Sequence, residues 1–253
     1  MRLLLVCDDL HVGGAQRQWA ELVLGLRERG VETRVLTVAE EGGFFEQLRD
    51  AGVAVRCLGF RGRLDPAGLR RALGEAGGRP DAVIAQQVSG QLVGAAIARR
   101  AVAPLVVTEH TPCTPDGGLL PRTGRQRLLT RLVAPRARRT IVVARAQVEP
   151  VLALGYRPET VRVIPNGVFP DRLVPARPRE QVRRELGVAD REFAVLCAAA
   201  MRPEKRVDAF VTAVAAARGR APHLRGFVAG DGRERETVER LAGGSGTTLL
   251  GVR

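Results

Sequence analysis

The sequence predicts an α/β protein with two doubly wound, parallel-sheet domains. Short apolar segments rich in Val and Ile alternate with amphipathic helical segments, which is typical of a parallel sheet covered on both faces. A stretch rich in Pro, Arg and Glu interrupts this alternation at 169–192, and the pattern then restarts. Because crossovers between parallel strands are right-handed, each half should form an open, doubly wound sheet.

Length and composition agree with two domains. The 253 residues, with 45% hydrophobic content, can form two modest cores. We expect a first domain at 1–166, a connector at 167–192 with a short helix near 179–186, and a second domain at 193–253. The first domain should end in a strand and a turn at 161–168, where Pro165 stops the strand and Asn166-Gly167 permits positive φ. We interpret this segment as a hinge, with a ligand in the cleft between the two domains.

The first domain should begin as a Rossmann-like strand, loop and helix. An apolar run at 2–7 is followed by a loop containing Gly13 and Gly14 and by an amphipathic helix to about residue 29. The backbone N–H groups of this loop suit a phosphate or a sugar hydroxyl, although a tight turn without a ligand explains the glycines equally well. The same pattern predicts later strands near 32–38, 53–58, 81–85, 104–108, 140–144 and 160–164, with helices near 44–51, 66–75, 90–100, 122–133 and 145–154.

The second domain repeats the pattern in a shorter form. We expect a buried strand at 193–200, a loop at 201–206, a helix at 207–218 and a strand at 224–229, then the turn Gly230-Asp231-Gly232, a helix to about 242 and a strand at 247–250. A complete doubly wound sheet of this type has about five or six strands. The second domain is therefore expected to be incomplete.

Composition narrows the class of protein. No segment reaches the run of about 18 uncharged apolar residues that a membrane-spanning helix needs, and the N-terminus is too short for a secretion signal. We therefore expect a cytoplasmic protein. The four cysteines form no C-x-x-C pair, so free, buried thiols are expected.

The net charge of +13 raises the question of a nucleic-acid partner. All but one of the 40 basic residues are arginine, and they are spread over nearly every predicted helix. A compositional preference for arginine explains this distribution at least as well as a polyanionic partner does. Aromatic residues, which would stack on single strands, make up only 4% of the chain. We therefore expect no nucleic-acid binding.

Two sites carry candidate functional residues. His110 follows the fifth predicted strand, and open α/β sheets place ligand contacts at the carboxyl ends of their strands; Glu109 would orient it. Lys205, the only lysine, lies in a strand-to-helix loop, where its ammonium group and Arg206 would bind a diphosphate. A loop histidine and a solvated lysine are the simpler alternatives.

Several motifs are missing from the sequence. There is no G-x-G-x-x-G, D-x-D, H-E-x-x-H, G-x-S-x-G or P-loop motif. These absences disfavour a dinucleotide cofactor, a bound metal, a serine hydrolase and a P-loop enzyme. A Rossmann-type oxidoreductase is weakened for the same reason.

Five segments in order resemble the motifs of the retaining glycosyltransferases of family 4, which have the GT-B fold. The matching segments are Gly13-Gly14-Ala15-Gln16-Arg17 for G-G-A-[EQ]-R, 161–168 for V-x-V-I-P-N-G-V, 202–206 for x-P-E-K-[GR], Gly230-Asp231-Gly232 for G-D-G, and Leu249-Leu250-Gly251 for the following L-G strand. The resemblance implies an acceptor-side first domain and a donor-binding second domain. It also implies a nucleotide-sugar donor as co-substrate, no further cofactor, no metal, and transfer with retention of configuration.

The resemblance also suggests residue roles. His110 would lie beside the transferred sugar, and Lys205 would neutralise the diphosphate leaving group. The remaining candidates divide into a donor-binding set, Gly13, Gly14, Arg202 and Arg206, and an acceptor-side set, Gln16 and Glu109. Domain closure would assemble this site.

Two departures from the family pattern bear on activity. Family members commonly carry a phosphate-binding arginine five residues before the lysine, and this position is Ala200. The E-x7-E segment, which in the family contacts the donor, is absent from the second domain at 193–253. We therefore expect a shortened enzyme that turns over poorly. A non-catalytic remnant that binds a sugar or an acceptor is the alternative.

The acceptor would be a sugar, a lipid-linked compound or a small molecule. The stretch 119–139 carries leucines among seven arginines, and a basic amphipathic helix of this kind could rest on anionic lipid at the inner membrane face. An ordinary crossover helix in an arginine-rich protein explains the same pattern more simply.

Overall fold

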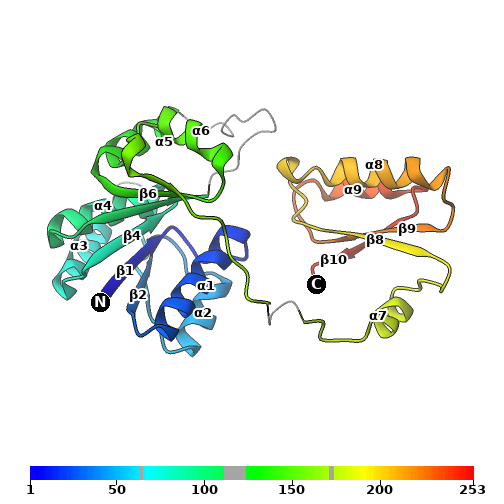
Figure 1. Ribbon diagram of the computed structural model, residues 1–253, viewed down its shortest axis with the longest axis horizontal. Coiled ribbons are helices and arrows are strands. Elements are labelled where there is room, and N and C mark those ends of the chain that lie inside the picture. Colours follow the sequence, from blue (N-terminus) through cyan, green and yellow to red (C-terminus); the bar gives the residue numbers. More distant parts are fainter. Residues whose placement is uncertain (63–64, 111–123, 171–173) are drawn as a thin grey trace. The chain divides into compact units, whose positions relative to one another are not determined.

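The computed structural model describes residues 1–62, 65–110, 124–170 and 174–253. The chain divides into two compact units, Met1–Phe169 and Pro170–Arg253, and each is treated by itself. Both units are α/β (Figure 1).

The first unit is built on a seven-stranded parallel sheet, as the alternation predicted. The strand order is β3-β2-β1-β4-β5-β6-β7, and all neighbours pair in parallel. The strands are β1 Arg2–Cys7, β2 Glu32–Thr37, β3 Ala54–Cys57, β4 Ala82–Gln86, β5 Leu105–Glu109, β6 Ala137–Val142 and β7 Val161–Val163. The expected doubly wound sheet is confirmed.

Helices cover both faces of this sheet (Figure 1). Along β1, Leu3 and Leu5 point to a core that includes Trp19, whereas Leu4 and Val6 point to a second core that includes Ile97. The first core is closed by α1 Gly14–Glu28 and α2 Gly43–Asp50, and the second by α3 Pro66–Gly74, α4 Val88–Ala101, α5 Gly124–Val133 and α6 Val148–Ala153. This two-sided burial explains why the strands are apolar throughout.

The strand order places a switch point between β1 and β4. The chain runs outward from β1 through β2 to β3, and then returns to the other side of β1 and runs outward through β5 to β7. Loops leaving the carboxyl ends of β1 and β4 therefore diverge to opposite faces. Ligands of open α/β sheets bind in the crevice that this divergence leaves.

The basic stretch 119–139 is helical only in part, where α5 agrees with the helix expected near 122–133. Residues 119–123 lie outside the described stretches, and α5 ends at Val133. Arg138 and Arg139 belong to β6. The β-branched run that follows them pairs with β5, so the strand expected near 140–144 is present and begins at Ala137. Leu128 and Leu132 remain exposed on the helix.

The second unit has a three-stranded parallel sheet among its described residues, in the order β10-β9-β8. Its strands are β8 Phe193–Ala198, β9 Leu224–Ala229 and β10 Thr247–Gly251, and its helices are α7 Arg179–Glu185, α8 Val207–Arg218 and α9 Arg235–Ala242. Val207 and Val211 of α8 and Val238 of α9 pack together with Val228 of β9.

The prediction that β8 is buried is wrong. Phe193 and Leu196 are 62% and 61% exposed. Cys197 and Ala199 face the core formed with α8 and α9, whereas Leu196 points to the opposite face. β8 is also an edge strand here, with β9 as its only neighbour among the described residues. The apolar composition of β8 therefore predicted more burial than the strand has.

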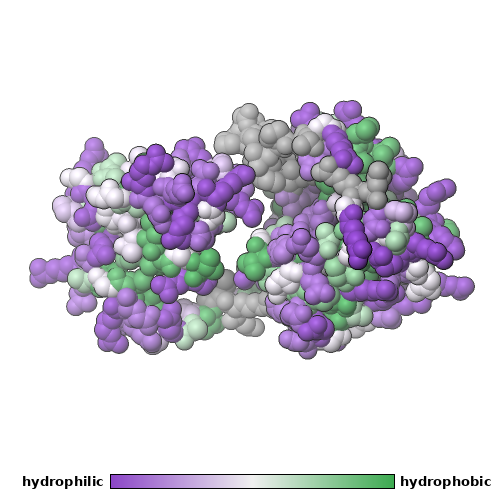
Figure 2. Space-filling model, turned by 180° about the vertical axis from the view of Figure 1, so that it is seen from behind, coloured by the Kyte–Doolittle hydropathy of each residue, from purple (hydrophilic) through white to green (hydrophobic). Residues whose placement is uncertain are grey.

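Surface and cysteine chemistry are unremarkable. Figure 2 shows hydrophilic side chains over most of the visible surface, with smaller apolar areas between them. Within the described stretches, every helix is too short or too polar to cross a membrane. Cys7, Cys57 and Cys197 are free, but only Cys7 is buried, so the expectation of buried thiols is wrong for the other two. Cys113 lies outside the described residues.

Candidate active site

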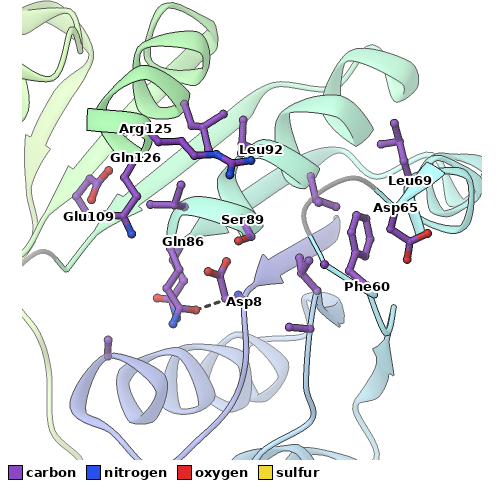
Figure 3. Close-up of a pocket in the computed structure, with 18 of the residues that line it drawn as sticks. Asp8, Phe60, Asp65, Leu69, Gln86, Ser89, Leu92, Glu109, Arg125 and Gln126 are labelled. Atoms are coloured by element: carbon purple, nitrogen blue, oxygen red, sulfur yellow. Dashed lines mark hydrogen bonds between the residues drawn. The ribbon is translucent and has the colours of Figure 1, made fainter. Parts of the chain in front are cut away.

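The first unit contains a cavity of about 990 Å³ at the carboxyl edge of its sheet (Figure 3). Five strands in succession contribute to it through their last residues or the residues that follow. These are Asp8 after β1, Val38 and Ala39 after β2, Phe60 after β3, Gln86 and Gln87 at the end of β4, and Glu109 and His110 at the end of β5. The cavity therefore lies where the switch point predicts a ligand.

Helices supply the rest of the cavity wall, and the apolar and polar side chains lie on different parts of that wall. Apolar side chains come mainly from the α3, α4 and α5 side, where Leu69, Leu92 and Leu129 lie. Polar groups gather at the strand ends and at the start of α4, with Asp8, Gln86 and Ser89 close together in Figure 3. The cavity thus has a polar floor and an apolar side.

Asp8 fastens the end of β1 to the start of α4. Its carboxylate accepts a hydrogen bond from the backbone N–H of Gly90 in the first turn of that helix. Burial raises the pKa of Asp8 above its ordinary value, and the bonds from Gly90 and Ser89 oppose this shift. The floor of the cavity therefore contains a carboxyl group that protonates more readily than an exposed one.

Gln87 holds a strained backbone conformation beside Asp8. Its φ is 60° and its ψ is 161°, a region that residues other than glycine rarely adopt. Its side-chain Oε1 accepts a hydrogen bond from the backbone N–H of Asp8 at 3.0 Å, and its carbonyl accepts one from Gln91 at 2.9 Å. Strain of this kind costs about 1–3 kcal/mol and persists where surrounding contacts enforce it.

Glu109 is buried and held by two neighbours. Its Oε1 accepts hydrogen bonds from Tyr156 Oη at 2.8 Å and from Gln91 Nε2 at 3.0 Å. His110, the next residue, is half-buried at the cavity wall. Burial lowers the pKa of His110, and the charge of Glu109 partly offsets this shift. A neutral imidazole that can hydrogen-bond to a ligand hydroxyl is therefore favoured at this wall near neutral pH.

The glycine loop begins α1 but contributes little to the cavity wall. Gly13 is the N-cap residue, and Ala15 is the residue of this turn that lines the cavity. A Cβ on Gly13 would lie 2.6 Å from Oε1 of Gln16, whereas one on Gly14 would meet nothing within 4 Å. Gln16 Nε2 donates to Asp9 Oδ1 at 3.0 Å. The open space at Gly14 leaves its backbone approachable.

In the second unit, Lys205 lies at the carboxyl edge of the sheet. It ends a 3₁₀ turn, Pro203–Lys205, between β8 and α8, with Arg202 as the N-cap residue. Lys205 is exposed and forms no ion pair among the described residues. Arg206 differs, because its Nε lies 3.1 Å from Oδ1 of Asp208. Lys205 is therefore the freer cation for an anionic ligand.

The loop after β9 supports the loop that carries Lys205. A Cβ on Gly230 would lie 2.0 Å from the carbonyl oxygen of Ala199, and one on Gly232 would lie 2.6 Å from that of Met201. The backbone N–H of Met201 also donates to the carbonyl of Asp231 at 2.9 Å. Only glycine allows these backbones to approach so closely.

Sequence reasoning found two of the residues at the cavity, His110 and Glu109, and missed Asp8, Gln86 and Gln87. The missed residues follow β1 and β4, which are far apart in the chain but adjacent in the sheet. A signal for them existed, since each comes directly at the end of a predicted apolar strand.

The comparisons with known proteins agree with this architecture. Residues 13–167 match the family described as glycosyl transferase 4-like domain. This chain belongs to that family. The match includes nearly all of the residues that line the cavity. A comparison with curated proteins gave no significant match.

Solved structures share the fold over the whole chain. HepE from Anabaena, in a structure with UDP, has a TM-score of 0.80 at 23% identity, covering 100% of this chain and 70% of its own. WaaG, a glycosyltransferase of lipopolysaccharide biosynthesis, has a TM-score of 0.69 at 18% identity and covers 100% and 70%. UDP-GlcNAc 2-epimerase from Methanocaldococcus jannaschii has a TM-score of 0.64 at 12% identity and covers 100% and 74%. The GT-B fold is therefore shown, and it is shared by transferases and an epimerase.

Proposed function

We propose that this protein is a glycosyltransferase that moves a sugar from a nucleotide-sugar donor to an acceptor with retention of configuration. The observation that carries the proposal is the family match over the residues that build the cavity. The similarity to HepE, whose structures include complexes with UDP and with UDP-glucose, supports a uridine nucleotide as the donor. In the reaction, the oxygen of an acceptor hydroxyl bonds to the anomeric carbon of the donor sugar, and the bond from that carbon to the phosphate oxygen breaks. The electron pair of the broken bond leaves with the nucleoside diphosphate, whose departing oxygen takes up the hydroxyl proton.

The donor diphosphate would bind at the carboxyl edge of the second sheet. Lys205 is exposed there and Arg202 adjoins it, so two cations would oppose the charge that grows on the leaving group. Arg206 would contribute less, because Asp208 already neutralises it. With leaving-group charge opposed by protein cations, this proposal requires neither a metal nor another cofactor. The backbone N–H groups of the Gly13-Gly14 turn would also contribute to donor binding.

The acceptor would occupy the cavity of the first unit. His110, half-buried and favoured as a neutral group, would hydrogen-bond to the transferred sugar. Glu109 is fixed by Tyr156 and Gln91 and would position that end of the wall. Gln16, bonded to Asp9 and next in sequence to the lining residue Ala15, would contact the acceptor.

A non-catalytic sugar-binding protein is the second candidate. Ala200 is exposed just after β8 and provides no cation where the family commonly has an arginine. Such a protein would bind ligands in the first unit without releasing a nucleotide from a nucleotide-sugar. Donor binding and nucleotide release separate the two candidates.

Calorimetry with UDP-, GDP- and ADP-glucose tests the proposal. One of these donors should bind, and Lys205→Ala should weaken it roughly tenfold or more, since a hydrogen bond to a charged group contributes about 1.5–3 kcal/mol. Arg220→Ala is the matched control, because it removes an exposed cation beyond the opposite end of α8. No binding of any donor, or equal affinity in the Lys205→Ala variant, would contradict the proposed function.

A further inference from the structure

We infer that Gln86 binds an uncharged, hydroxyl-bearing group of the ligand that occupies the first-unit cavity. Gln86 is the last residue of β4, and β4 lies beside β1 at the switch point. Its side chain lines the cavity near Asp8 and Ser89 (Figure 3). The family match and the structural relatives assign it no role.

The amide of Gln86 is buried without a partner. The residue is only 1% exposed, and neither Nε2 nor Oε1 has a hydrogen-bond partner in the part of the chain that the structure describes. Leaving such an amide unpaired is costly, and buried polar groups in proteins nearly always find partners. Several other buried side chains in the described stretches also have an unpaired polar atom, but those residues do not line the cavity. A ligand in the cavity would supply the partners.

Neighbouring residues restrict the movement of this amide. Gln87 is held in its strained conformation by the backbone N–H of Asp8, and the Asp8 carboxylate is held by Gly90. The end of β4 is therefore tied to both β1 and α4. A side chain on so fixed a segment is suited to selecting a ligand by geometry.

Charge in the cavity decides what kind of group would bind. Asp8 and Glu109 place carboxyl groups on the polar floor, and both would repel a carboxylate or a phosphate. Arg125 is the only arginine or lysine among the lining residues described, and it lies on α5 and is exposed. An anionic group is therefore disfavoured beside Gln86, and a neutral one is favoured.

The amide itself narrows the choice further. It presents one donor group and one acceptor group side by side, so its best partner offers an acceptor and a donor at similar spacing. Two neighbouring hydroxyl groups of a sugar meet this requirement. The apolar side formed by Phe60, Leu69 and Leu92 would accept an uncharged hydrocarbon part of the same ligand.

Describing this ligand as the acceptor depends on the proposed function, whereas its binding at Gln86 does not. A suitable probe is n-octyl β-D-glucopyranoside below its micelle concentration, which joins a neutral sugar to an alkyl chain. Octanoate has a similar chain with an anionic head and is the matched negative probe. Calorimetry with the full chain measures both.

Gln86→Leu should weaken binding of octyl glucoside at least tenfold, because it removes both hydrogen-bonding atoms at similar volume. Gln147→Leu is the control: Gln147 is also buried, but its Oε1 accepts hydrogen bonds from Val143 and Ala144 at 2.8 and 3.2 Å, outside the cavity. This control should bind octyl glucoside like the unaltered protein. No binding to the unaltered protein, equal binding by Gln86→Leu, or tighter binding of octanoate would overturn the inference.

Thermal unfolding without ligand provides an independent test. Gln86→Leu should raise the melting temperature because it removes an unpaired buried amide, whereas Gln147→Leu should lower it because it removes satisfied bonds. A lower melting temperature for Gln86→Leu would show that Gln86 has a structural partner and would overturn the inference. UDP-glucose binding separates the two proposals. If UDP-glucose binds but Gln86→Leu does not change octyl glucoside binding, only this inference fails. If UDP-glucose does not bind but Gln86→Leu weakens octyl glucoside binding, only the proposed function fails.

Discussion

Replacing Gly230 with alanine tests the contact between the two loops at the carboxyl edge of the second sheet. Gly230 has a φ of 143°, and an added Cβ would lie 2.0 Å from the carbonyl oxygen of Ala199. Backbone strain in such a region costs about 1–3 kcal/mol, and forcing an extra carbon into a packed site costs about 1–3 kcal/mol more. We therefore expect Gly230→Ala to lose about 3 kcal/mol or more of unfolding free energy.

For a unit the size of Pro170–Arg253, each kcal/mol shifts the melting temperature by about 4–8 °C, so the loss should be roughly 12–24 °C. Scanning calorimetry of the full chain would follow the transition of the second unit. Gly244→Ala is the control, because Gly244 also has positive φ, 76°, but a Cβ there meets nothing within 4 Å. It should lose only the strain, about 1–2 kcal/mol. The close-packing argument fails if Gly230→Ala is no more destabilising than Gly244→Ala.

Three further predictions concern the first unit. Because burial raises the pKa of Asp8, the unaltered protein should lose stability as the pH rises above 3.8, and Asp8→Asn, which keeps an acceptor for Gly90, should lose less in urea titrations at increasing pH. Because burial lowers the pKa of His110, NMR should show its imidazole titrating below 6.5. The stability that the neutral imidazole contributes should be lost as the pH falls from 6.5 through this lowered pKa. A titration midpoint at or above 6.5 would refute the burial of His110. Gln18→Leu should speed hydrogen exchange at the Gly167 amide. Gln18 Oε1 accepts a hydrogen bond from the Gly167 N–H at 3.1 Å, and Gln18 Nε2 donates to the Gly167 carbonyl at 2.7 Å. Unchanged exchange would show that these two bonds do not hold the backbone at Gly167.

The fold was largely predictable because its signals are local. Each signal depends on residues that are close together in the chain. These signals are the alternation of apolar and amphipathic segments, the glycines at helix starts and the polar connector. Burial in the second unit was not predictable in this way. Leu196 is as apolar as any core residue, and only the sheet order and the helix placement show that its face of β8 is uncovered.

The site was predictable only in part, because it depends on which strands become neighbours. His110 and Glu109 could be proposed from their place after an apolar strand. Asp8 and Gln86 acquire significance only when β1 pairs with β4, a contact between distant parts of the chain. The lack of a partner for the Gln86 amide is likewise a property of packing, and no pattern in the sequence indicates it.

The most direct test of the account is hydrogen exchange of the full chain with and without UDP-glucose. Lys205 and Arg202 lie in the proposed diphosphate site, and the loop after β9 packs against their loop, so exchange should slow at 201–206 and 230–235. At a UDP-glucose concentration near the dissociation constant of the unaltered protein, this protection should be clearly smaller in Lys205→Ala and unchanged in Arg220→Ala. Unchanged exchange in both loops at saturating UDP-glucose, or protection confined to the cavity residues 86–90, would contradict the proposal that the second unit binds the donor.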